Sequence, residues 1–154
     1  MTVDTASDLA LVTGLYRTTN AAVRELDQRL TRDHDVTFIQ AVTLLAIRSF
    51  DRPQPHLVAD YLSQQSQTVT GVLDRLERAG HISRQRDLGD RRAVRLELTE
   101  SGRKLVDAIS KSLRQHVVDV LKGVEPQRRR SLQSDLDHLE LSIKSAAPGR
   151  AAAS

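Results

Sequence analysis

The sequence predicts a mostly α-helical fold with one small β-hairpin, and three observations support this prediction. Apolar residues recur every three or four positions over most of the 154 residues, which is the period of amphipathic helices. The period changes to two in the segments 82–86 and 94–98, on either side of a polar turn. Aromatic residues make up 3% of the chain and Trp is absent, so the core must be aliphatic, as in packed helices. For a chain of this length we expect a single domain over residues 1–154.

Two amphipathic helices open the chain. The first is expected over residues 7–32, where one apolar stripe contains Leu11, Leu15, Ala22, Leu26 and Leu30. The second is expected to start after Thr37, a favourable N-cap residue that has Gln40 three positions later as its capping-box partner. We expect this second helix to be largely buried, because it carries the apolar residues Phe38, Ile39, Val42, Leu45 and Ile47.

A helix-turn-helix follows the two prolines of the segment 51–55, which stop the preceding helix. A short helix is expected over residues 56–62, with inward-facing side chains at Leu57, Ala59 and Leu62. A Gln-rich link then leads to another helix, which ends at Gly80 and whose buried stripe is Val69, Val72, Leu73 and Leu76. A helix, a tight link and a second helix have the spacing of a helix-turn-helix.

The strands 82–86 and 94–98 are expected to form a hairpin with a basic tip. Its turn reads DLGDRR, in which Gly89 supplies the backbone freedom that a tight loop needs. Arg91 and Arg92 lie at the tip, where Asp90 can orient a guanidinium through a bidentate pair. A helix followed by such a hairpin makes residues 37–98 a winged helix-turn-helix, which can reach both grooves of DNA. The alternative is that Asp90 and the arginines only hold the hairpin together.

The outward face of the second helix begins with amides and hydroxyls rather than with Glu and Lys pairs. Gln can bond adenine edges and Thr can offer a hydroxyl or a methyl group, so this turn is expected to read bases. Its N-terminus favours an anion such as a phosphate. The predicted base readers are Gln67, Thr68 and Thr70, and the predicted phosphate contacts are Ser66 and Arg75. The complete predicted DNA-binding set is Gln65, Ser66, Gln67, Thr68, Thr70, Arg75, Arg86, Asp90, Arg91 and Arg92. The alternative is a merely polar, solvated face.

Positive charge is concentrated in the same region. The whole chain carries a formal net charge of +3, whereas the window 75–95 alone has seven Arg against three acidic residues. The rest of the chain is therefore slightly negative. A local cationic surface on a nearly neutral body is typical of a DNA-binding face. The alternative from charge alone is a solvated hairpin edge that is protected from aggregation.

Two further helices are expected after the hairpin. Thr99 caps the first, whose apolar stripe contains Leu105, Ile109, Leu113, Val117, Val120 and Leu121. Pro126 starts the second, which is expected to bury Leu132, Leu136, Leu139 and Ile143. The segments 7–32 and 100–145 are more than a small winged domain needs to cover its core, so they are predicted to be dimerisation helices of a homodimer. The alternative is an intramolecular bundle in a monomer. The Ala-rich segment 146–154 is expected to be a disordered tail.

The sequence argues against an enzyme and against a cofactor. Cys is absent, so disulfides and thiolate metal sites are excluded. The five His residues show no spacing of three or four that would place two on one helix face, so no metal site is expected. Gly-flanked nucleophile turns and glycine-rich phosphate loops are also absent. No secretory signal and no apolar run of roughly 18 residues is present, so we expect a cytoplasmic protein without a membrane partner.

Two adjoining motifs carry a family resemblance. TVTGVLDRLERAGHISR occupies residues 68–84, and the wing signature DRRAVRLELTESG occupies residues 90–102. In order and spacing, from about Thr37 to Leu105, they resemble the MarR family of bacterial transcriptional regulators. One departure is the link SQQSQ, where many relatives place a Gly and an apolar residue, and this leaves the first residue of the recognition helix open.

The resemblance implies a function beyond DNA binding. It implies a homodimeric repressor that binds a pseudo-palindromic operator in double-stranded DNA and releases it when a small-molecule effector binds. Such effectors are typically aromatic or amphipathic, and the implied crevice lies near Tyr16, Phe38, Val42 and Leu113. A second function class stays open, a winged-helix protein-interaction module without specific DNA binding.

Overall fold

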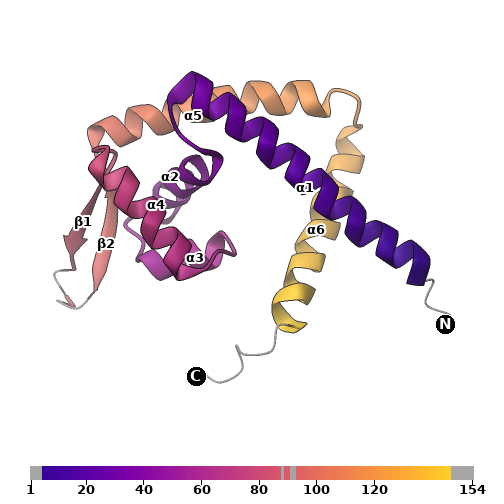
Figure 1. The fold of residues 1–154 in the computed structure, drawn as a ribbon, viewed down its shortest axis with the longest axis horizontal. Coiled ribbons are helices and arrows are strands. Elements are labelled where there is room, and N and C mark those ends of the chain that lie inside the picture. Colours follow the sequence, from indigo (N-terminus) through magenta and orange to yellow (C-terminus); the bar gives the residue numbers. More distant parts are fainter. Residues whose placement is uncertain (1–4, 88, 91–92, 147–154) are drawn as a thin grey trace. The chain divides into compact units, whose positions relative to one another are not determined.

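The computed structural model describes residues 5–87, 89–90 and 93–146. These residues are mostly helical, with one two-stranded antiparallel sheet, as the sequence predicts (Figure 1). The chain divides into two compact units, residues 1–112 and residues 113–154, which we call the winged unit and the C-terminal unit. The elements in order are α1 (Thr5–His34), α2 (Phe38–Phe50), α3 (Pro55–Tyr61), α4 (Ser66–Arg78), β1 (Ile82–Arg86), β2 (Val94–Leu98), α5 (Glu100–Leu121) and α6 (Pro126–Ala146).

The first two helices join through the predicted capping box. The Thr37 backbone N–H donates to Gln40 Oε1 at 2.8 Å, and the Gln40 N–H donates to Thr37 Oγ1 at 3.4 Å. Asp27 of α1 adds a second connection, because its Oδ1 accepts a 2.7 Å hydrogen bond from the Phe38 N–H. These bonds satisfy N–H groups that the first turn of α2 leaves without helical partners.

The buried face of α2 differs from the predicted one. Of the predicted apolar residues only Ile47 is buried, and Phe38, Ile39, Val42 and Leu45 are half-buried. The helix packs against α4 and β2, and the face that it buries there contains small side chains as well as large apolar ones. That buried face consists of Ala41, Thr43, Leu44, Ala46 and Ile47.

The helix-turn-helix is formed by α3 and α4. Pro55 occupies the start of α3, and Val58 and Ala59 are its buried residues. The predicted inward position of Leu57 is wrong, because 44% of this side chain is exposed and its neighbour Val58 fills the core instead. The predicted stripe of α4 is confirmed at Val69, Val72, Leu73 and Leu76. The chain then leaves the helix at Gly80, where φ is 76°, a conformation that favours glycine.

The hairpin has the predicted strands. β1 and β2 pair antiparallel in a register that sets Ile82 opposite Leu98 and Arg86 opposite Val94. Ile82 and Leu96 are buried, and the Leu96 N–H also donates to the Pro53 carbonyl at 3.0 Å. The hairpin is thereby attached both to α4, which β1 contacts, and to the loop after α2.

The C-terminal unit, described by itself, consists of the end of α5 and all of α6. Pro126 is the first residue of α6, as predicted. The predicted burial in α6 is wrong for the single chain, because none of its described residues is buried. Leu132 is 53% exposed, Leu136 39% and Ile143 62%, and Leu139 is half-buried. The chain alone thus leaves this apolar stripe in contact with solvent.

Candidate nucleic-acid interface

The N-terminal turn of α4 presents the polar side chains that the sequence singles out. Ser66, Gln67, Thr68 and Thr70 are all exposed, and Gln65 is the N-cap residue. Among the described residues no side chain caps this helix, so its first N–H groups remain available to an anion. The Thr70 hydroxyl donates to the Ser66 carbonyl at 2.8 Å, which leaves its lone pairs and its methyl group for a ligand.

An ion-pair network fixes this helix to the hairpin. Arg84 of β1 donates to Asp74 at 2.7 Å and to Glu77 at 2.6 Å, both on α4. Partial burial lowers the pKa of Arg84, but the Asp74 hydrogen bond and the charges of Glu77 and Asp74 outweigh it and raise the pKa overall. Arg84 therefore stays charged and sets the position of β1 against α4, and its own charge is compensated within the fold.

Asp87 organises the base of the wing turn. Its carboxylate accepts hydrogen bonds from Arg95 Nε at 2.6 Å, from the Gly89 N–H at 2.8 Å and from the Asp90 N–H at 3.2 Å. These bonds, the one from Arg95 first, lower the pKa of Asp87 to about 2. Two backbone hydrogen bonds also close the turn. The Asp87 N–H donates to the Ala93 carbonyl at 3.0 Å, and the Ala93 N–H donates to the Asp90 carbonyl at 2.9 Å.

Asp87 was not among the predicted site residues, although its sequence position contained a signal. An Asp two residues before a Gly in a turn is a common acceptor for backbone N–H groups. Asp90, the predicted orienter, is described and exposed. Its predicted partners Arg91 and Arg92 lie outside the described residues, so that assignment stays a prediction.

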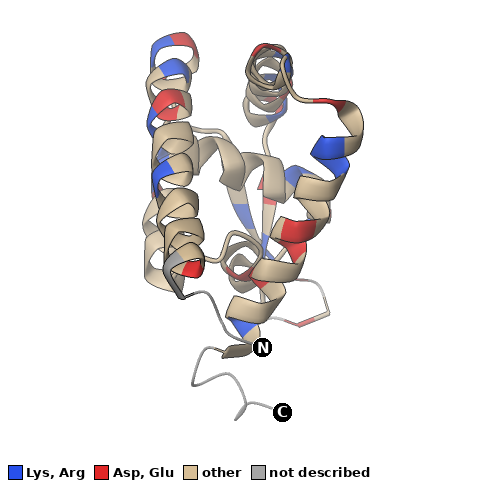
Figure 2. Ribbon diagram, turned by 90° about the vertical axis from the view of Figure 1, so that its right-hand side faces the viewer, with Lys and Arg blue, Asp and Glu red and all other residues tan. Residues whose placement is uncertain are grey.

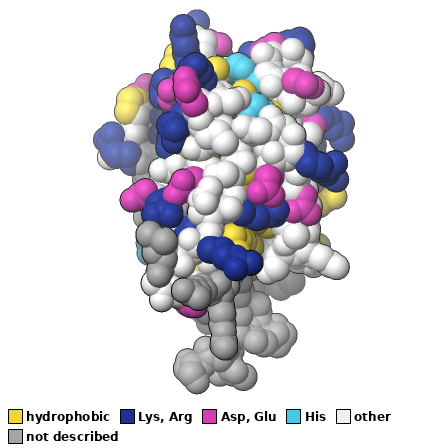
Figure 3. Space-filling model, turned by 90° about the vertical axis from the view of Figure 1, so that its left-hand side faces the viewer, with side chains coloured by type: hydrophobic (Ala, Val, Ile, Leu, Met, Phe, Trp, Pro, Cys, Tyr) yellow, Lys and Arg dark blue, Asp and Glu magenta, His cyan; other side chains and the backbone are white. Residues whose placement is uncertain are grey.

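The described basic residues of the window 75–95 fall into two groups. Arg84 and Arg95 are held in ion pairs with carboxylates of the winged unit. Arg75, Arg78 and Arg86 are exposed and form no ion pair within the described part of the chain. Figure 3 shows that Lys and Arg side chains are interspersed with Asp and Glu on the face it draws, and Figure 2 shows both signs along the same helices. Among the described residues of this window, the positive charge available to a polyanion is therefore that of the second group.

The predicted effector residues are distributed over α1 and α2 of the winged unit and the C-terminal unit, and their role stays a prediction. Tyr16 is 71% exposed on α1, whereas Phe38 and Val42 are half-buried on one face of α2. Leu113 is half-buried and belongs to the C-terminal unit. The described residues include no cluster of metal-ligating side chains and no helix of the length and apolarity needed to span a membrane.

Comparison with known proteins agrees with this geometry. Residues 34–93 match the model of the MarR family. The HTH-type transcriptional regulator TtmR of Methylorubrum extorquens is 32% identical over 70% of this chain and 54% of its own length. The HTH-type transcriptional repressor NicR of Pseudomonas putida is 35% identical over 57% of this chain and 56% of its own length. The matched part of the chain thus spans about half the length of these curated relatives.

A solved structure extends the likeness to most of the chain. The crystal structure of the S. aureus MepR–DNA complex superposes with a TM-score of 0.74 at 25% identity, over 84% of this chain and 94% of that protein. TtmR is named as a transcriptional regulator and NicR as a transcriptional repressor, which agrees with the expectation that this chain is not an enzyme.

Proposed function

We propose that the chain is a transcriptional regulator of the MarR family, whose model matches residues 34–93, and that it binds double-stranded DNA as a homodimer. The observation that carries the proposal is the exposed, uncapped N-terminal turn of α4 beside a basic hairpin. MepR, whose fold is similar, is named as part of a DNA complex.

The proposed contacts follow from what each side chain offers. Gln67, Thr68 and Thr70 face outward and can hydrogen-bond base edges in the major groove. Ser66 and the N–H groups around it suit a phosphate, as do the exposed cations Arg75 and Arg86. In this proposal the hairpin tip reaches the minor groove, with Arg92 or Arg91 inserted and Asp90 as its orienter.

A homodimer accounts for the exposed apolar side chains outside the winged core. On α1, Leu9, Leu11 and Val12 are each more than half exposed. The far end of α5 and the whole of α6 add exposed residues, which are Val117, Val118, Val120, Leu132, Leu136, Leu141 and Ile143. Exposed apolar surface of this kind marks a protein interface, and a two-fold axis covers identical patches with each other. The operator would be a pseudo-palindrome with half-sites about 10 bp apart.

Repression and effector release complete the proposal, and both rest on family likeness. The name of NicR identifies that protein as a repressor, which favours repression here. The effector would be a small aromatic or amphipathic molecule near Tyr16, Phe38, Val42 and Leu113. A cytoplasmic location follows from the proposed function, because the target DNA of a bacterial regulator lies in the cytoplasm.

Salt dependence of duplex binding tests the DNA-binding proposal. Purified protein is used to select genomic fragments, and the affinity for a selected fragment is measured by fluorescence anisotropy from low to moderate salt. Phosphate contacts release counterions, so affinity should fall steeply, by about 10³-fold or more between 50 and 200 mM salt for six or more contacts. Weak duplex binding at every salt concentration would instead favour the alternative, a protein-interaction module.

A further inference from the structure

Of the proposed base readers, Thr70 has its hydroxyl already hydrogen-bonded within α4. The hydroxyl donates to the Ser66 carbonyl, four residues earlier, at 2.8 Å, so the side chain has no proton left to donate to a base. The residue is nevertheless exposed. Its methyl group is therefore the main group that it can present to a ligand. In the major groove, an apolar group of this kind suits the C5-methyl group of thymine, which adenine, guanine and cytosine lack.

Gly71 leaves the helix without a side chain next to Thr70. A glycine inside a helix lowers its stability relative to alanine. A Cβ added here would meet nothing within 4 Å among the described residues, and the backbone is not in the left-handed region, so the fold itself does not require glycine at this position. A bare position of this kind permits close approach of the helix backbone to a ligand. Gln67 lies three residues before Thr70 and four before Gly71, so the three positions are neighbours on the helix surface.

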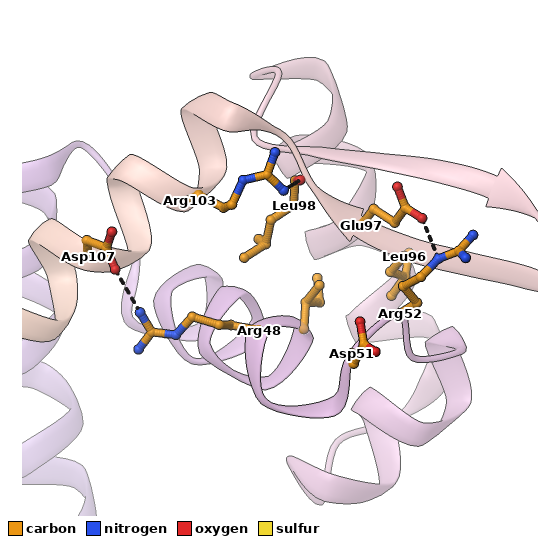
Figure 4. Close-up of a pocket in the computed structure, with 9 residues that line it drawn as sticks. Arg48, Asp51, Arg52, Leu96, Glu97, Leu98, Arg103 and Asp107 are labelled. Atoms are coloured by element: carbon orange, nitrogen blue, oxygen red, sulfur yellow. Dashed lines mark hydrogen bonds and ion pairs between the residues drawn. The ribbon is translucent and has the colours of Figure 1, made fainter.

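The start of α4 offers neutral groups rather than charges. Residues 66–73 contain no charged side chain, and the basic residues of α4 lie in its last turn. Two arginines that line the cleft between α2, β2 and α5 are held in ion pairs, because Figure 4 shows Arg48 paired with Asp107 and Arg52 paired with Glu97. Guanine is most often read by Arg or Lys, whereas amides and methyl groups suit adenine and thymine. The composition of this turn therefore favours A·T pairs.

We propose that Thr70 recognises the C5-methyl group of a thymine through its own methyl group, and that Gly71 lets the helix come close enough for this contact. The preferred ligand is a duplex with an A·T pair facing Thr70 in each half-site. This inference rests on the proposed DNA-binding function and names the base that one residue of the recognition helix reads.

Replacement of thymine by deoxyuridine tests the methyl contact, since uracil pairs with adenine as thymine does and lacks only the C5-methyl group. The thymines in one half-site of a selected genomic fragment are replaced one at a time, and affinity is measured by fluorescence anisotropy. We expect one position at which the replacement weakens binding about fourfold, the effect of burying one methyl group. This ratio should stay constant as salt is raised, because an apolar contact releases no counterions.

Two variants of Thr70 separate its methyl group from its hydroxyl. Thr70→Ser keeps the hydroxyl but removes the methyl group, so it should bind the thymine and uracil fragments equally. Thr70→Val keeps a methyl group at the same place and removes the hydroxyl, so it should retain the preference for thymine. Gln67→Ala is the matched control on the same exposed face, and it should weaken binding of both fragments by the same factor.

Gly71→Ala tests the close approach. Alanine favours a helix, so the midpoint of urea unfolding should rise or stay the same. Binding of the fragment should weaken about fivefold or more, the loss typical of one specific base contact. A lower unfolding midpoint would show that the fold requires this glycine, and an unchanged affinity would show that the helix does not come close at this point. Either result overturns the assignment of Gly71.

The assignment of Thr70 is overturned if no single thymine shows the preference, if Thr70→Ser retains it, or if Thr70→Val loses it. The last two results would assign the contact to the threonine oxygen or to another residue. In each of these cases a fragment that is still bound with a steep salt dependence leaves the proposed function standing. Absence of duplex binding at every salt concentration would instead contradict the proposed function, and this inference with it.

Discussion

Single carboxylates decide how the wing and the recognition helix are held. Asp87 binds one guanidinium and two backbone N–H groups, so it determines the path of the chain into the turn. Asp74 and Glu77 share Arg84 and attach β1 to α4. Two of the arginines in the basic window are therefore held in ion pairs within the fold, and the proposed DNA contacts fall to their exposed neighbours.

The wing arginines carry the most direct prediction for DNA affinity. Arg92→Ala should weaken operator binding by about 1–3 kcal/mol, the size of a specific groove contact. Arg91→Ala tests the neighbouring candidate, and Lys111→Gln serves as a charge control on α5. Gel shifts with a selected fragment measure the change. If neither Arg91→Ala nor Arg92→Ala lowers affinity, the proposed role of the wing is wrong.

Protonation of Asp87 at acid pH should lower the stability of the wing turn. Its pKa in the folded protein is about 2, below the usual 3.8, so its contribution is present above pH 4 and is lost as the pH falls toward 2. Protonation at that point weakens the bond to Arg95. NMR titration of the Asp87 carboxyl carbon should give a midpoint near 2, and Asp87→Asn should destabilise the turn at pH 7. A midpoint at the usual value would show that the bond from Arg95 does not form in solution.

Among the elements, the junction between α4, β2 and α5 depends on close backbone approach. Thr99 Oγ1 donates to the Gly80 carbonyl at 2.7 Å and accepts from the Gly102 N–H at 3.0 Å. One side chain therefore connects the turn that follows α4 to the first turn of α5. A Cβ added at Gly102 would lie 1.9 Å from the His81 carbonyl oxygen. This explains why a glycine stands three residues after Thr99 in the wing signature.

Gly102→Ala should therefore destabilise the winged unit. The overpacked methyl group must displace backbone, at a cost of about 1–3 kcal/mol or more. Gly14→Ala is the matched control, because Gly14 lies within α1 and a Cβ there meets nothing within 4 Å. That change should be neutral or stabilising by up to about 1 kcal/mol. Urea unfolding followed by circular dichroism measures both, and equal effects would contradict the close approach at Gly102.

For the molecule as a whole, the distribution of apolar surface separates the two units. The winged unit has a buried aliphatic core that includes Leu44, Leu73 and Leu96. In the C-terminal unit, α6 has no buried residue within its described length although it carries a clear apolar stripe. A helix of this kind gains most of its stability from packing, so it needs a partner surface.

Oligomeric state tests this interpretation. We expect the wild type to sediment as a dimer in analytical ultracentrifugation, and the double variant Leu132→Glu, Leu136→Glu to sediment as a monomer, because charges cannot be buried in an apolar interface. Leu57→Glu is the control, because the Leu57 side chain has a similar exposed fraction, 44%, but lies on α3. A monomeric wild type, or dissociation by the control as well, would contradict the proposed interface.

Local features of this protein were predictable from its sequence. These features depend only on residues close together in the sequence or on a fixed period of apolar residues, so the sequence alone predicts them. They are the strands 82–86 and 94–98, the capping box at Thr37 and Gln40, the start of α6 at Pro126 and the buried stripe of α4. The basic window and the polar turn of α4 were visible for the same reason.

Other features required the folded chain. Arg84 meets Asp74 and Glu77, Arg95 meets Asp87, and Arg103 lines a cleft with residues of α2, because packing brings distant segments together. The choice of Val58 over Leu57 for the core depends on the rotation of a two-turn helix against its neighbours, which no period resolves over seven residues. Periodicity determines which face of a long helix is apolar, whereas three-dimensional packing determines what that face meets and which charges remain free to bind.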